Sequence, residues 1–241
     1  MYGRVDRIKK RKKMSTNIYS PQIFRKIFAN EKNVALTTDF VNACLEQIDS
    51  KCIENPRIVE PYSPNEFCNR HISSEYLLKV NFCEDTPQDR VFVESRHERN
   101  SILRDGLVFY AANHAKNVTD EEKNKYVHFE KFFVVNIIFY DVFPDSEGYC
   151  HTSWFEFSHP MQYFDKWFDV IIEVGKFLKK SSEFADDNSR LTQWIRAIDT
   201  LNRNADFSKF ATDPVFCALQ DEVNLCKMEN AACLPPHSMC S

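Results

Sequence analysis

The run FFVVNIIF, residues 132–139, constrains the fold of this chain more than any other part of the sequence. Its β-branched and aromatic residues scarcely alternate with polar ones, which is typical of a strand covered on both faces. The run is also far shorter than the roughly 20 residues needed to cross a bilayer. It therefore predicts a fully buried core strand and no membrane span.

Two runs that precede this strand predict a β-hairpin. Residues 75–82, EYLLKVNF, and residues 90–96, RVFVESR, have the composition of strands, and CEDTPQD between them is typical of a turn. Apolar residues recur at helical spacing in residues 101–115, so the chain is expected to return across the sheet as a helix. Residues 151–159, HTSWFEFSH, are expected to add an edge strand.

The N-terminal region predicts an arm followed by two helices. Residues 1–19 contain the cationic stretch RVDRIKKRKK, which has little to bury and is expected to be a disordered basic arm. In residues 20–48 the apolar residues form two stripes at helical spacing, broken near residues 30–33. Ser20 with Pro21 suits an N-cap and first turn.

The C-terminal region predicts mainly helices. Residues 163–178 are expected to form a strand that enters a helix, and residues 189–203 and 213–229 two further helices. Together the elements indicate a single α/β fold, a mixed sheet flanked by helices, with C-terminal helices. We divide the chain into the arm 1–19, an α/β domain 20–205, a C-terminal helical segment 206–230 and a tail 231–241.

The composition excludes some functions. Only four glycines are present, with no Walker-type loop and no dinucleotide fingerprint, which argues against a nucleotide cofactor. A formal net charge of −4 gives no argument for a nucleic-acid partner, so any such argument must rest on local clusters. The nine cysteines include no C-x-x-C pair, which favours reduced thiols and a cytoplasmic protein.

Several motifs, in this order along the chain, are similar to those of one protein family. FRKIF with FVNACL resembles the opening helices FKxxF and FLNA, and LLKVNF with RVFVES stands where that family has LDVxA and FNIEMQ. FYAANHA takes the place of YYWSKLY, FFVVNIIFYDVF resembles VIxINILDFxLF, and LTQWIRAIDT resembles a closing helix. The chain thus resembles the PD-(D/E)XK nuclease superfamily, in its recombination-promoting nuclease and transposase branch, which is related to mobile elements.

This resemblance implies a restriction-endonuclease-like mixed sheet and a place for a metal site. In such a site two carboxylates on adjacent strands hold Mg²⁺, which activates a water near the scissile phosphate. Glu94 keeps one carboxylate, whereas Lys79 stands where the other acid is expected. The third polar group of the family, usually glutamine, falls at Arg96, and an acid often found before the opening phenylalanine falls at Pro21.

The missing acids predict an impaired catalytic site. One carboxylate holds Mg²⁺ poorly, which favours an inactive protein. We expect no cofactor if the protein is inactive, and Mg²⁺ if it is active. In the first hypothesis, Lys79 and Arg96 flank Glu94 as an ion-pair cluster that replaces the charge of the metal. In the second, a rearranged site is active: Glu94 binds the metal, with Glu75 as second ligand, and Arg96 contacts phosphate or water.

The cations near the same strand suggest what the protein binds. Five residues could hold a nucleic-acid backbone without cutting it: Lys79, Arg90, Arg96, His97 and Arg99. The alternative reading, of equal weight, is that they are ordinary solvent charges balanced by nearby acids. A DNA-binding pseudoenzyme, a Mg²⁺-dependent DNA endonuclease and a scaffold for a protein partner are therefore all kept as hypotheses.

Overall fold

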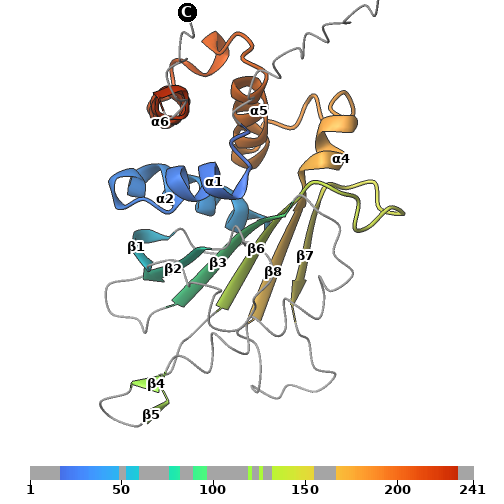
Figure 1. Cartoon of the computed structure of the whole chain (residues 1–241). Coiled ribbons are helices and arrows are strands. Elements are labelled where there is room, and N and C mark those ends of the chain that lie inside the picture. Colours follow the sequence, from blue (N-terminus) through green and yellow to red (C-terminus); the bar gives the residue numbers. More distant parts are fainter. Residues whose placement is uncertain are drawn as a thin grey trace, which may run out of the picture.

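The computed structural model describes residues 17–48, 53–59, 76–81, 89–96, 119–120, 125–126, 132–154 and 167–232. A six-stranded mixed sheet forms its centre, and helices gather at one side of that sheet (Figure 1). The helix expected at residues 101–115 lies outside the described residues, and so do residues 1–16 of the expected arm. The prediction of an α/β fold with C-terminal helices is confirmed.

The strands of the large sheet follow the spatial order β1–β2–β3–β6–β8–β7. Their bounds are Glu54–Val59 for β1, Tyr76–Asn81 for β2, Asp89–Arg96 for β3, Phe132–Ile138 for β6, Cys150–Trp154 for β7 and Trp167–Glu173 for β8. The strand β3 is parallel to β6, and β6 is parallel to β8, whereas the other three pairs are antiparallel. The predicted hairpin is thereby confirmed as β2–β3, and the predicted edge strand as β7.

The strand β6 lies between two parallel neighbours, as the buried run in the sequence predicted. Residues 133–138 are all buried, so both faces of this strand are covered. Two further short strands, β4 (Thr119–Asp120) and β5 (Lys125–Tyr126), form a separate antiparallel pair.

The helices come before and after the sheet in the sequence. Their bounds are Pro21–Phe28 for α1, Val34–Leu45 for α2, Val174–Lys179 for α4, Arg190–Asn202 for α5 and Pro214–Ala232 for α6. Short 3-10 turns occupy Glu31–Asn33 (η1), Glu46–Ile48 (η2) and Ser208–Phe210 (η4). The two expected N-terminal helices are therefore confirmed, with their break at η1, and β8 runs directly into α4 as predicted.

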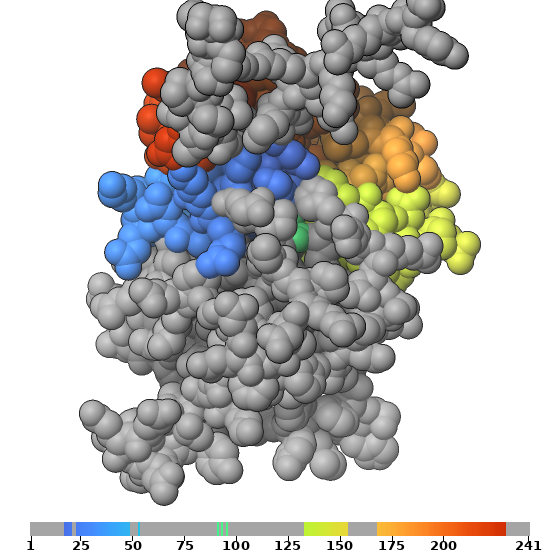
Figure 2. Space-filling view, viewed as in Figure 1, coloured from blue at the N-terminus to red at the C-terminus, as the bar shows by residue number. Residues whose placement is uncertain are grey.

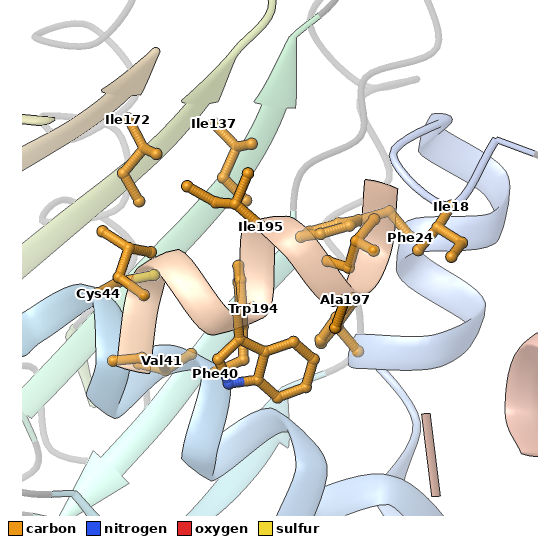
Figure 3. Close-up of a cluster of buried hydrophobic side chains, with 14 of the residues drawn as sticks. Ile18, Phe24, Phe40, Val41, Cys44, Ile137, Ile172, Trp194, Ile195 and Ala197 are labelled. Carbon is orange, nitrogen blue, oxygen red and sulfur yellow. The ribbon is translucent and has the colours of Figure 1, made fainter. Parts of the chain in front are cut away.

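An aromatic core joins the helices to one face of the sheet. Trp194 of α5 is fully buried, and its ring centroid lies 5.3 Å from that of Phe40 and 5.1 Å from that of Phe216. Figure 3 shows Ile195 of α5 close to Ile137 and Ile172, which come from the strands β6 and β8. Burial of this many large apolar side chains supplies the main driving force for the fold.

Ion pairs tie the same helices together. Arg190 at the start of α5 pairs with Asp39 of α2, with 2.7 Å between Nε and Oδ1, and with Asp213 before α6, with 2.5 Å between Nη1 and Oδ2. The indole N–H of Trp194 donates to Asp39 at 2.7 Å. Figure 2 shows the atoms of α1 and α2, in blue, adjoining those of α6, in red.

Two residues of the expected arm, 1–19, belong to the core. Ile18 and Tyr19 are buried in it. The backbone N–H of Ile18 donates to the side chain of Asn202 at 2.8 Å, and the carbonyl of Tyr19 accepts from Ser95 at 2.9 Å. The burial of Ile18 and Tyr19 could not be predicted from periodicity, because two apolar residues in an extended segment form no repeat.

Candidate functional site

The sheet has two different faces, which the strand alternation separates. In β3, Val91, Val93 and Ser95 are buried against the helices, and Ser95 donates to the backbone of Tyr19. We call this side the helix face, because the strands β6 and β8 contribute Val135, Ile137, Val170 and Ile172 to the same core. The opposite side, here called the second face, receives the alternate residues of every strand, and the candidate site residues Glu94 and Arg96 belong to it.

Glu94 belongs to β3, the third of the six strands in the sheet. In the register of the sheet Glu94 is paired with Asn136 of β6. The same row continues with Ile171 of β8 and His151 of β7. Arg96 is two residues further along β3, in the row that contains Ile138 and Glu173. Two neighbours of Glu94 in this arrangement, Asn136 and Arg96, are polar.

Lys79 does not stand beside Glu94. It is paired with Arg90, and the antiparallel hairpin places Glu94 four residues further along β3. At about 3.3 Å per residue this separation is roughly 13 Å. The ion-pair cluster predicted from the sequence, in which Lys79 flanks Glu94, therefore does not fit this register. The alternation in β3 separated the buried Val91, Val93 and Ser95 from Glu94 and Arg96, but it left the stagger between the strands open.

A row of cations replaces that predicted cluster. On its other side Lys79 is paired with Arg57 of β1, so Arg57, Lys79 and Arg90 follow one another across three neighbouring strands. We call this set the cation row. Residues paired across a ladder share a face of the sheet, so the cation row and Glu94 are on the same face. Nothing in the sequence singles out Arg57, because only the pairing of β1 with β2 brings it next to Lys79.

Asn136 differs from the other buried polar residues of the sheet. Its side chain is 0% exposed, yet neither its amide oxygen nor its amide nitrogen has a hydrogen-bond partner among the residues that the structure describes. Unpartnered buried amides are rare, since the loss of water is not offset. One signal in the sequence could have revealed it: Asn136 is the single polar residue in FFVVNIIF.

A polar network occupies the end of β8 on the same face. The carboxylate of Glu173 is fully buried and accepts the backbone N–H groups of Val142 at 2.5 Å and Phe143 at 3.1 Å. Its other oxygen lies 2.7 Å from Nε2 of His151 and 2.6 Å from Nζ of Lys176. These contacts fix the segment between β6 and β7 against the start of α4.

Hydrogen bonds keep Glu173 ionised. Burial acts to raise the pKa of Glu173, but hydrogen bonds from Lys176, Phe143, Val142 and His151 outweigh it and hold the pKa below its ordinary value. Lys176 also donates to the carbonyls of Phe143 at 2.6 Å and Ser146 at 3.1 Å. The network is therefore saturated with partners, and its role is to hold the loop.

Three candidate residues lie outside the described part of the chain: Glu75, His97 and Arg99. The last described pair of the hairpin joins Tyr76 with Val93, and these residues directly follow Glu75 and directly precede Glu94 in the sequence. Within the described residues no group of three or more His, Cys, Asp or Glu side chains is placed to hold a metal ion. None of the helices that the structure describes has the length and apolar character needed to cross a membrane.

Comparison with known proteins gives one match. The sequence model of the family described as PD-(D/E)XK nuclease family transposase matches residues 22–233. No curated protein and no solved structure matches the chain. The matched segment begins in α1 and ends directly after α6, so it includes the whole sheet and both groups of helices.

Proposed function

The chain belongs to the PD-(D/E)XK nuclease family transposases, and from this premise we propose that it binds the phosphate backbone of nucleic acid through the second face of its sheet, without cleaving it. The cation row is the observation that carries the proposal. Like charges directly opposite one another in a sheet destabilise it, and here three follow in succession. An anion that contacts all three removes this repulsion, and a nucleic-acid backbone offers such anions in series.

The proposed loss of cleavage rests on the ligands that remain. Mg²⁺ sheds its water reluctantly and is held in active nucleases by concentrated negative charge. Of the two acids that the family places on the hairpin, Glu94 is kept, and Lys79 stands at the position of the other. Lys79 is a member of the cation row, so the position of a metal ligand has become a position for binding phosphate.

A binding experiment tests this function directly. We expect the full chain to bind duplex DNA in the presence of EDTA, with affinity that falls steeply as salt is added. Lys79→Ala and Arg90→Ala should each lower the slope of log K against log salt by about 1. Lys209→Ala is the matched control, because Lys209 is exposed on η4 and is not part of the sheet, and its slope should equal that of the wild type.

Two outcomes would contradict this proposal in different ways. Equal slopes for Lys79→Ala and Lys209→Ala would show that the cation row does not contact phosphate. No binding at low salt would exclude the nucleic-acid role and favour a scaffold for a protein partner.

The active endonuclease is the second candidate, and the register of the hairpin favours it. The pairing of Tyr76 with Val93 is the described feature that supports Glu75 as a partner of Glu94. In such a site Mg²⁺ would act as a Lewis acid and lower the pKa of a bound water. Nicking of a plasmid with Mg²⁺ or Mn²⁺, abolished by Glu94→Ala, would establish this function and overturn the loss of cleavage.

A further inference from the structure

The outer face of the last helix, α6, exposes apolar side chains. Among the residues that the structure describes, the large apolar side chains that are exposed are Leu225, at 51%, and Met228, at 69%. Ala218 and Asp221 precede them at helical spacing and are exposed as well, so the four residues form one line along the helix. We call this set the α6 stripe.

The opposite face of α6 is buried. Phe216, Leu219, Val223 and Cys226 of that face belong to the hydrophobic core. A helix that is apolar on two sides is typical of one that is covered on both, and clustered exposed apolar residues often mark a binding surface. The α6 stripe therefore indicates a docking surface.

The charges beside the stripe define the chemistry of what docks there. Asp221 is part of the stripe, and Glu222 and Glu229 directly follow stripe residues in the sequence. Glu229 pairs with the exposed Lys26 of α1, whereas no ion pair is recorded for Asp221 or Glu222 within the described part of the chain. Two copies of this face would bring like charges together, so a cationic segment with a few apolar residues fits better than a second α6.

The N-terminal segment leaves the core beside this helix. The backbone N–H of Ile18 donates to Asn202, the last residue of α5, at 2.8 Å, and Asn204 accepts from Lys227 of α6 at 2.8 Å. Residues 1–16, which lie outside the described residues, precede this point and span at most about 55 Å when extended. The 19 residues of α6 are about 28 Å long, so the segment can reach every turn of the helix.

Residues 1–16 have the composition that the stripe requires. They contain the apolar Val5 and Ile8, a single acid, Asp6, and a run of cations: Arg4, Arg7, Lys9, Lys10, Arg11, Lys12 and Lys13. We propose that this segment docks on the α6 stripe of its own chain. Val5 and Ile8 then cover the apolar residues of the stripe, and the lysines approach Asp221. Because the segment is tethered nearby, its effective concentration at α6 is on the order of millimolar, so weak contacts suffice to hold it.

Carbodiimide cross-linking of the full chain, without nucleic acid and followed by mass spectrometry, tests this docking. The reagent joins a lysine amine to a carboxylate in contact with it and adds no spacer. We expect the lysines of residues 9–13 to be joined to Asp221 or Glu222 in a product of monomer size. Glu183, which is exposed after α4, is the control acid and should be joined to the same lysines much more slowly.

Removal of the apolar side chains separates docking from a general attraction between charges. The double variant Leu225→Ser with Met228→Ser keeps the acids, and both changes are at exposed positions that the fold tolerates, so its cross-linking rate should fall severalfold. Ala35→Ser, at an exposed position of α2, is the matched control and should react as the wild type does. The comparison measures docking and not stability, since exposed ion pairs contribute little to the free energy of unfolding.

Three outcomes would each overturn the proposal. They are an unchanged rate in the double variant, equal reaction of Glu183 and Asp221, and cross-links that occur only in a product of dimer size, which would place a second copy on the stripe. The cation row takes no part in this contact and its DNA binding is measured separately, so failure of the docking and failure of the proposed function give different results.

Discussion

Glu173 and Asn136 are both buried polar residues on the second face, on the neighbouring strands β8 and β6, but their surroundings differ completely. Glu173 accepts two backbone N–H groups and contacts two cationic or titratable side chains. Asn136 has no hydrogen-bond partner within the described residues. The same face of one sheet thus contains a saturated polar group and an unsatisfied one.

The difference separates a structural role from a candidate functional one. A saturated buried charge contributes to the folded state, and its removal leaves its partners buried without compensation. A buried amide costs stability unless a water or a neighbouring group satisfies it. We therefore assign Glu173 to the architecture of the loop, and its contrast with Asn136 can be tested by comparing the stability of variants.

The largest expected effect is that of Glu173→Ala. This change leaves Lys176 buried without its carboxylate partner, and it leaves the N–H groups of Val142 and Phe143 without an acceptor. The free energy of unfolding should therefore fall by about 3–5 kcal/mol. Urea denaturation measures the change. The exposed control Asp221→Ala should stay within about 0.5 kcal/mol of the wild type. A loss as small as that of the control would mean that Glu173 is not the anchor of the loop.

The close approach of Gly175, two residues after Glu173, to the backbone of Phe139 gives a smaller expected effect. A Cβ at Gly175 would lie 2.5 Å from the backbone oxygen of Phe139, so Gly175→Ala forces the start of α4 away from the segment after β6. Figure 2 shows that segment, in yellow, adjoining α4. We expect a loss of about 1–3 kcal/mol in urea denaturation.

Gly148→Ala is the matched control for this prediction. The nearest atom to a Cβ at Gly148 is 3.8 Å away, which is an ordinary contact, and the backbone there has no positive φ. The change should be neutral or stabilise by up to about 1 kcal/mol, because it restricts the unfolded chain. Equal losses for the two glycines would mean that the close packing of α4 against Phe139 is not what Gly175 is needed for.

Asn136→Leu should have the opposite sign from Glu173→Ala. It removes an unsatisfied amide and adds apolar surface of nearly the same size, so we expect the free energy of unfolding to be unchanged or to rise by about 1 kcal/mol. Thermal or urea denaturation without divalent cations measures it. A loss of several kcal/mol would show that the amide has a structural partner, and the contrast with Glu173 would then disappear.

The fold was largely predictable because it depends on local patterns. The hairpin, the run that became β6 and the paired N-terminal helices each carry a clear period in the sequence. The entry of β8 into α4 was also predictable, since the apolar run continues without a turn signal. Such elements follow from which residues face the core.

The site was less predictable because it depends on register. The sequence placed Lys79 beside Glu94 through the resemblance to a family motif, whereas the ladder pairs Lys79 with Arg90 and Arg57. When one strand shifts along its neighbour by an even number of residues, each side chain keeps its face of the sheet. The pattern of apolar residues therefore does not distinguish between such registers. Asn136 was visible as one polar residue in an apolar run, but the sequence does not reveal whether a buried amide has a partner.

The smallest expected effect is the pH dependence that Glu173 contributes. Because its pKa in the folded protein is lowered below the ordinary value of 4.5, its ionised form stabilises the fold above that pH. The stabilisation is fully present above the ordinary pKa of 4.5. It is lost as the pH falls from 4.5 through the lower pKa that Glu173 has in the folded protein. We expect the stability difference between wild type and Glu173→Gln, measured by urea denaturation, to shrink between about pH 7 and pH 3. Asn136 does not titrate, so Asn136→Leu should show a difference from the wild type that is independent of pH over the same range. A difference in the free energy of unfolding that stays constant with pH for Glu173→Gln would mean that the charge of the carboxylate gains nothing from Lys176 and His151. Glu173 would then be no better satisfied electrostatically than the amide of Asn136.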